Sequence, residues 1–231
     1  MHARYARAPG RACARCRCAL RQTTAADSLR AVPEATGERI ELRDGSAALV
    51  RPIAPEDRTV LAEAFERLSD ESRYRRFFSA KPRLSDAELT YLTEVDHHDH
   101  EALIAFDADS GLGIGVARFV RNDEDAGLAE AAVTVTDDAQ GRGLGTALLS
   151  RLADRAREEG VDRFSALVLA DNRDMLDLLE RAGEVRRRDI EAGVVEIEIA
   201  LEPPGAGARL QQLLREAAEG LIAVAARLRG D

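Results

Sequence analysis

Hydrophobic and polar positions follow regular patterns from about residue 46 to residue 202 of this 231-residue chain. Short apolar or alternating runs predict strands, and apolar residues three to four positions apart predict helices. The strands are expected at 47–53, 102–106, 114–120, 128–136, 164–169 and 194–201, with another near Val185, and the helices from Pro55, from Ser85, at 143–159 and at 173–181. This order predicts an α/β (α+β) fold with a mixed, partly antiparallel sheet flanked by helices.

The two ends of the chain differ from this central segment. Residues 1–36 contain seven arginines and two acidic residues and lack hydrophobic periodicity, so we interpret 1–45 as a disordered basic leader and 46–202 as the domain. Apolar residues at heptad-like spacing in 203–231 predict an appended C-terminal amphipathic helix. This helix is expected to pack on its own domain or on a second copy of the chain, which leaves a homodimer open.

Composition narrows the range of partners. The formal net charge is −9 and only 4% of the residues are aromatic. Chains that bind nucleic acid or anionic membranes over their whole surface are generally basic, so neither partner is expected. The chain contains no secretory signal core and no apolar run near the ~20 residues of a membrane span, which favours a cytoplasmic protein.

Two groups of potential metal ligands are present, and neither has the spacing of a metal site. Cys13, Cys16 and Cys18 all lie in the leader, where no fourth zinc ligand besides His2 is near. The run from His97 to His100 consists of consecutive residues, which rarely converge on one ion, so we expect a polar turn, with contact to a substrate as the alternative. No metal is therefore expected.

The segment that indicates chemistry runs from Val133 to Thr146, where a β-branched strand enters a glycine-rich turn and then a helix. Gly141, Gly143 and Gly145 leave out Cβ atoms where the backbone must approach a ligand. Free N–H groups at a helix start, at the positive end of its dipole, form a cradle for phosphate. The Walker and dinucleotide-binding patterns both fail in residue type or spacing, so a different phosphate-bearing ligand is indicated.

The sequence Gln-Gly-Arg-Gly-Leu-Gly at 140–145 resembles the pyrophosphate loop of the GNAT N-acetyltransferases. A second segment, Ala170-Asp171-Asn172 followed by a helix ending near Gly183, resembles another motif of that family. The resemblance covers about residues 46–202 and implies the GNAT fold, acyltransferase activity and acetyl-CoA as co-substrate. The residues that it assigns to acetyl-CoA are Val133, Val135, Gln140, Gly141, Arg142, Gly143, Gly145, Thr146 and Asn172.

Residues 129–133 and 73–78 also look like the acetyltransferase domain of bacterial protein-lysine acetyltransferases of the Pat type. This likeness implies that Glu130 is the general base and that the acceptor is a primary amine, either a protein lysine or a small amine. A lysine ammonium has a pKa of about 10.4, so a nearby carboxylate is needed to take its proton at neutral pH. Strand alternation places Glu130, Ala132 and Thr134 on one face, which also fits a solvated strand residue.

Leu179 occupies the position at which many GNAT members carry a tyrosine that protonates the departing thiolate. A thiol with a pKa of roughly 8.5 can leave unaided or take a proton from water, so this departure does not exclude catalysis. It keeps open an alternative, a non-catalytic sensor module that binds coenzyme A. The arginines at 73–76 fit either a solvated helix face or a contact with the 3′-phosphate or an acidic substrate.

Overall fold

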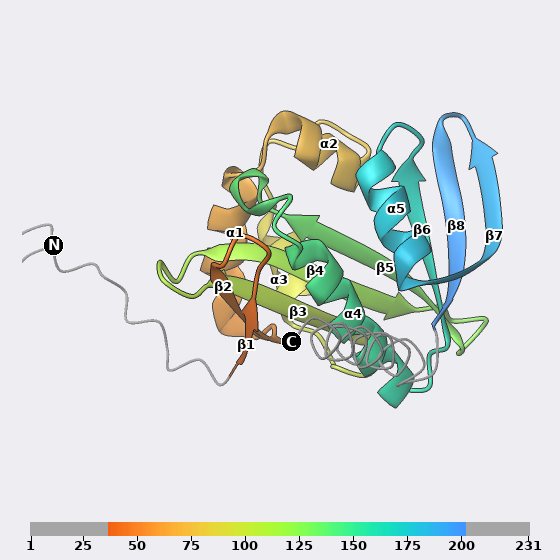
Figure 1. Ribbon diagram of the computed structural model, residues 1–231, viewed down its shortest axis with the longest axis horizontal. Helices are drawn as coiled ribbons and strands as arrows, with labels where there is room; N and C mark the ends of the chain where they lie inside the picture. The colour runs from red at the N-terminus through yellow and green to blue at the C-terminus, as the bar shows by residue number, and fades with distance from the viewer. Residues whose placement is uncertain (1–36, 202–231) are drawn as a thin grey trace, which may run out of the picture. The chain divides into compact units, whose positions relative to one another are not determined.

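The computed structural model describes residues 37–201, which form one sheet covered by helices (Figure 1). The strands are β1 (Glu38–Glu41), β2 (Ala47–Pro52), β3 (His100–Asp107), β4 (Gly113–Arg121), β5 (Leu128–Val135), β6 (Arg163–Leu169), β7 (Gly183–Glu191) and β8 (Val194–Leu201). The helices are α1 (Arg58–Glu66), α2 (Asp70–Phe77), α3 (Asp86–Thr93), α4 (Leu144–Glu158) and α5 (Arg173–Ala182), with short 3-10 turns η1 (Pro55–Asp57) and η2 (Asp137–Ala139).

The sheet has the strand order β1-β2-β3-β4-β5-β6-β8-β7. Every neighbouring pair is antiparallel except β5 and β6, which run parallel because the chain crosses over through α4. The expected mixed, partly antiparallel sheet flanked by helices is confirmed.

Two hydrophobic cores lie on opposite faces of the sheet. The larger core joins α4 and α5 to one face through buried residues such as Leu148, Phe119 and Phe164. The smaller core lies under α1 and α3 on the other face and includes Leu61 and Ile104. Figure 1 shows α4 and α5 together on the near face.

The observed elements match most of the predicted ones, with two corrections. The domain starts earlier than residue 46, because Glu38–Glu41 pairs with β2 as an edge strand. Only Ile40 of that strand is buried, so its hydrophobic signal is weak. Helix α2 was also missed, because none of its residues is buried and it shows no apolar stripe.

Gly183, which the sequence placed at the end of a helix, is needed for close approach between strands. It is the first residue of β7, and a Cβ atom there would lie 2.1 Å from the carbonyl oxygen of Ala200 on β8. The extra strand expected near Val185 is β7 itself, while the predicted C-terminal helix at 203–231 and the residues 1–36 lie outside the described residues. Within residues 37–201, every helix is too short or too polar to cross a membrane.

Candidate active site

The parallel pair β5–β6 separates part-way along its length. The strands pair at only three positions, the last joining Glu130 to Ser165, although β5 continues to Val135 and β6 to Leu169. Beyond Glu130 the two strands form the walls of a cleft of about 380 Å³. The separation leaves backbone hydrogen-bonding groups of β5 without a partner strand, as expected for a ligand-binding site.

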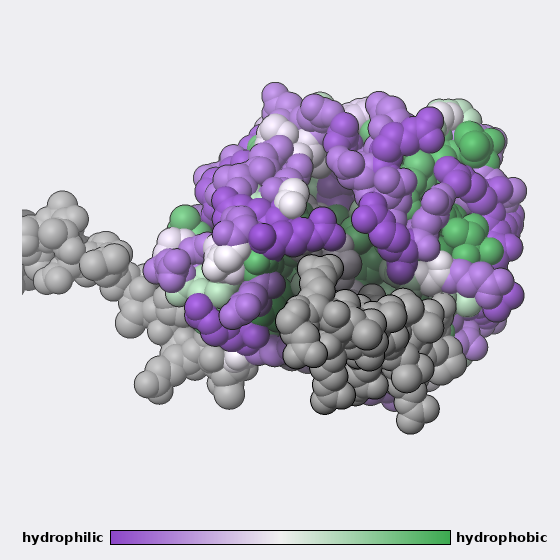
Figure 2. All heavy atoms as spheres, viewed as in Figure 1, coloured by the Kyte–Doolittle hydropathy of each residue, from purple (hydrophilic) through white to green (hydrophobic). Residues whose placement is uncertain are grey.

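The cleft collects nearly all the residues that the sequence assigned to one site. Helix α4 begins at one end of it, α5 and α2 border its sides, and hydrophilic residues predominate around it on the face drawn in Figure 2. The predicted residues that line it are Glu130, Val133, Val135, Gln140, Gly141, Gly143, Gly145, Thr146 and Asn172.

The glycine-rich turn gives α4 an open N-terminus. Gly141 and Gly143 have φ angles of 75° and 88°, in the left-handed region that favours glycine. The first backbone hydrogen bond across the start of α4 runs from the N–H of Ala147 to the carbonyl of Gly143 at 3.1 Å. The preceding N–H groups therefore remain available at the positive end of the helix dipole, where phosphate oxygens bind.

Arg142 does not lie where the sequence analysis placed it. Its guanidinium hydrogen-bonds the carbonyl of Asp138 and lies 3.3 Å from the Asp44 carboxylate, outside the residues that line the cleft. Arg43 is found there instead. Its side chain covers Gly143, so that a Cβ atom on that glycine would lie 3.2 Å from Arg43 Nε. Arg43 follows β1 in the segment 1–45, which the sequence analysis interpreted as a disordered leader. It was therefore not predicted as a residue of the site.

Glu130 is an exposed residue at the narrow end of the cleft, where β5 and β6 separate. The predicted alternation is confirmed: Ala129 and Ala131 are buried in the core beneath α4, whereas Ala132 and Thr134 line a smaller cavity on the opposite face. The carboxylate is therefore on the side of the sheet covered by α1, α2 and α3, and it remains exposed to solvent.

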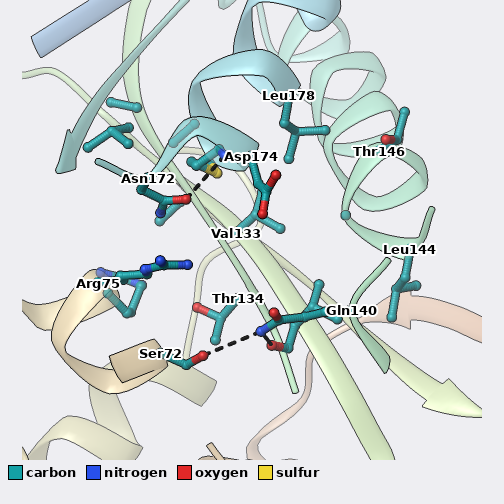
Figure 3. Close-up of a pocket in the computed structure, with 18 of the residues that line it drawn as sticks. Ser72, Arg75, Val133, Thr134, Gln140, Leu144, Thr146, Asn172, Asp174 and Leu178 are labelled. Atoms are coloured by element: carbon teal, nitrogen blue, oxygen red, sulfur yellow. Dashed lines mark hydrogen bonds between the residues drawn. The ribbon is translucent and has the colours of Figure 1, made fainter. Parts of the chain in front are cut away.

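Helix α2 is attached to the loop that follows β5. The Asp137 carboxylate accepts hydrogen bonds from the Ser69 N–H and hydroxyl, both at 2.8 Å, and from the Ser72 hydroxyl at 2.9 Å. Burial raises the pKa of Asp137, but these hydrogen bonds outweigh it and hold the pKa below its usual value. Gln140 adds a bridge, because its side-chain amide donates to Val135 O at 3.1 Å and to Ser72 Oγ at 3.4 Å (Figure 3).

The far side of the cleft is formed by the start of α5. Asn172 caps this helix by accepting a hydrogen bond from the Met175 N–H at 3.3 Å, and its amide nitrogen is free to donate into the cleft (Figure 3). Leu179 is fully buried in the core, whereas Leu178 contacts the cleft. The cleft residues within 37–201 include no tyrosine, and their hydroxyl groups come from Ser72, Thr134 and Thr146.

The histidine-rich turn is held by protein partners. His97 Nδ1 lies 2.7 Å from Glu101, a fully buried carboxylate that also contacts Arg155. His98 contacts Glu159 on α4. In the described part of the chain, no cluster of three or more histidine, cysteine or acidic side chains has the arrangement of a metal site.

Comparison with known proteins agrees with this geometry. The model of the acetyltransferase (GNAT) domain matches residues 48–185, which is more than half of the chain. The chain belongs to the GNAT acetyltransferase family. Among curated proteins, Acetyltransferase Pat of Mycolicibacterium smegmatis is 39% identical over 164 residues, covering 71% of this chain and 49% of that protein. An acetyltransferase of Pseudomonas aeruginosa is 35% identical over 150 residues, covering 64% of this chain and 80% of that protein.

Solved structures of the GNAT family show the same architecture. The GNAT domain of S. lividans PAT is 38% identical and superimposes with a TM-score of 0.66, covering 73% of this chain and 99% of that domain. This GNAT chain spans about half the length of the mycobacterial Pat protein. The likeness to the S. lividans domain confirms the GNAT fold expected from the glycine-rich loop.

Proposed function

We propose that the chain is an acetyl-CoA-dependent N-acetyltransferase that acylates a primary amine, either a protein lysine or a small amine. The observation that carries this proposal is the continuous cleft from the N-terminus of α4 to Glu130. One end offers free N–H groups to a pyrophosphate, and the other offers a carboxylate to an amine. Membership of the GNAT family and the likeness to Pat proteins support the same reaction.

The coenzyme would lie along the separated edge of β5. Its pyrophosphate would accept hydrogen bonds from the N–H groups between Gly141 and Thr146, with the Arg43 guanidinium beside them. The pantetheine arm would pair with backbone groups of β5 that β6 leaves unpaired. This placement brings the thioester toward the narrow end of the cleft, where Glu130 lies.

Glu130 would act as the general base. The carboxylate removes a proton from the acceptor ammonium, directly or through water, and the neutral amine attacks the thioester carbonyl carbon. A backbone N–H of the segment from Val133 to Val135 would stabilise the oxyanion. The new N–C bond forms, the C–S bond breaks, and the thiolate takes its proton from water because no tyrosine lines the described cleft.

The test is turnover by the wild-type protein and by Glu130→Gln. Thiol release from acetyl-CoA is measured with lysine peptides and with small amines as acceptors. Glu130→Gln should lower turnover at pH 7 by about 10²–10⁴-fold, and the deficit should shrink at high pH, where the amine arrives deprotonated. Its affinity for acetyl-CoA should remain unchanged. A Glu130→Gln protein with the wild-type rate at pH 7 would remove Glu130 from the mechanism.

A second candidate is a sensor that binds coenzyme A without turnover. The observation in its favour is Leu179, which is buried in the core at the position where many family members place a tyrosine. The two candidates predict the same coenzyme affinity. Absence of thiol release with every acceptor, together with tight coenzyme binding, would favour the sensor.

A further inference from the structure

Arg76 and Arg118 stand apart from the other arginines of residues 37–201. Arg118 is only 6% exposed and Arg76 is half-buried, yet neither forms an ion pair with a described residue. Every other arginine in this range is either exposed or paired with a carboxylate. Because removing a charge from water is costly, buried arginines normally have an anionic partner.

The hydrogen-bond partners of Arg118 are neutral. Its guanidinium donates to the carbonyl of Leu92 at 3.1 Å and lies 3.2 Å from His100 Nε2. Burial and the nearby Arg76 guanidinium lower the pKa of Arg118 to about 10, so it remains protonated at neutral pH. Burial also lowers the pKa of His100, with Arg118 adding to that effect, which keeps this imidazole uncharged. The local charge therefore stays positive.

Arg76 is similarly without a partner. Within residues 37–201 its guanidinium makes no hydrogen bond or ion pair and lies over the ring of Phe77, whose centroid is 5.1 Å away. Burial lowers the pKa of Arg76, and the field of Glu130 and Tyr91 opposes that effect. Glu130 acts on Arg76 through space but is not within ion-pair distance, so neither arginine has a directly bonded carboxylate among residues 37–201.

Both arginines line a small cavity beside the reaction cleft. The cavity has a volume of about 60 Å³, enough for a small group rather than a whole ligand, and its walls are mainly apolar side chains from α1, α2 and β4. Arg76, Ala132 and Thr134 border both this cavity and the cleft. A substituent one or two carbons long, attached to a substrate in the cleft, could therefore reach the cavity.

We propose that Arg76 and Arg118 form a subsite for a carboxylate carried by one of the substrates, next to the acyl-transfer centre. This inference rests on the proposed function and specifies its substrate class. The carboxylate can belong to the acyl chain, as in a dicarboxylic acyl-CoA, or to the amine acceptor, as in an amino acid. In both cases the reaction is the same amide formation with loss of the thiol, and the carboxylate only binds. Two guanidinium groups facing a carboxylate in a poorly hydrated cavity give strong, directional recognition.

The test first measures binding, which does not require turnover. In the first arm, calorimetry compares the affinities of succinyl-CoA and acetyl-CoA. In the second arm, it compares the affinities of an amino acid and its carboxamide, both measured with coenzyme A at saturating concentration. In one of the two arms the carboxylate-bearing ligand should bind at least tenfold more tightly. Arg76→Gln should reduce that preference to less than threefold and leave the neutral ligand unchanged. Arg39→Gln, a change at an exposed arginine that lines neither cavity, should keep it.

Arg118 is tested by Arg118→Lys. This variant keeps the positive charge and should disturb the buried position less than a neutral replacement such as Arg118→Gln. The variant should lose most of the preference while its melting temperature stays close to that of the wild type. Equal affinities for carboxylate and neutral ligands in both arms would overturn the proposal. So would a preference that survives Arg76→Gln and Arg118→Lys. Tight, discriminating binding without amide product would instead refute the acetyltransferase proposal and retain the subsite.

Discussion

Replacing Asp137 tests how firmly helix α2 is attached to the turn that follows β5. The Asp137 carboxylate accepts three hydrogen bonds from the first turn of α2, at 2.8, 2.8 and 2.9 Å. Its neighbour Asp138 makes only a 3.8 Å ion pair with Arg67. Both side chains are in the same turn, so Asp138→Ala is a matched control for Asp137→Ala.

The magnitude follows from these contacts. A hydrogen bond contributes about 0.5–1.5 kcal/mol net, and partial exposure puts each of the three toward the lower end, so Asp137→Ala should cost about 2 kcal/mol. For a chain of this size, that loss lowers the melting temperature by roughly 4–8 °C. Asp138→Ala removes one exposed, long ion pair and should cost less than about 0.5 kcal/mol.

Thermal unfolding as a function of pH provides the sharper assay. The hydrogen bonds hold the pKa of Asp137 in the folded protein below its usual value. The stability that this carboxylate contributes is therefore fully present above its pKa in the unfolded chain, and it is lost as the pH falls through its lower pKa in the folded protein. The difference between wild type and Asp137→Ala should therefore be constant from pH 6 to 8 and shrink in acid. Equal melting temperatures for Asp137→Ala and Asp138→Ala at pH 7 would refute the attachment of α2 to the loop.

The remaining predictions concern one backbone contact and one cation. Gly183→Ala places a Cβ atom 2.1 Å from Ala200 O and should destabilise the fold by about 1–3 kcal/mol, measured by chemical denaturation; an unchanged midpoint would contradict the close approach of β7 and β8. Arg43→Gln should weaken acetyl-CoA binding by about threefold to tenfold in calorimetry, because an exposed charged contact is worth up to about 1 kcal/mol or slightly more. Arg39→Gln, which changes an exposed arginine outside the cleft, should leave that affinity unchanged, and equal effects of the two variants would exclude a specific role for Arg43.

The sequence predicted those elements of the fold that carry a hydrophobic signal. Strand β5 and helix α4 have strong apolar patterns, and Ser85 and Glu88 form the expected reciprocal cap at the start of α3. Helix α2 has no buried residue and is held by polar contacts with Asp137, which depend on the folded loop. Strand β1 buries one side chain, so its place in the sheet comes from pairing with β2.

The site was predictable where the backbone geometry requires particular residues. It was less predictable where the orientation of a side chain depends on partners that only the fold brings near it. The glycines at 141 and 143, expected to leave out Cβ atoms beside a ligand, line the cleft and also have positive φ angles. The orientation of Arg142 could not be inferred, because its partner Asp44 comes from a distant turn. The position of Arg43 over Gly143 could not be inferred for the same reason, because the two residues are far apart in the sequence. The Arg76–Arg118 subsite depends on bringing α2 next to β4, and no pattern in the sequence indicates that these two elements meet.

The most direct test of the central claim is the affinity of Gly145→Asp for acetyl-CoA. Gly143 is unsuitable, because its φ is positive and Arg43 covers it. A Cβ atom on Gly145 would instead make ordinary van der Waals contacts, the nearest with Leu178 Cδ2 at 3.5 Å. An aspartate in the first turn of a helix favours folding through the helix dipole. It also places a negative charge where the pyrophosphate would bind.

Calorimetry should show that Gly145→Asp binds acetyl-CoA at least ~10-fold more weakly than the isosteric Gly145→Asn, a loss of about 1.4 kcal/mol or more, although its melting temperature is equal or higher. This result would place the coenzyme phosphates at the start of α4. Equal affinities of the two variants and the wild type would contradict the cleft between β5 and β6 as the coenzyme site.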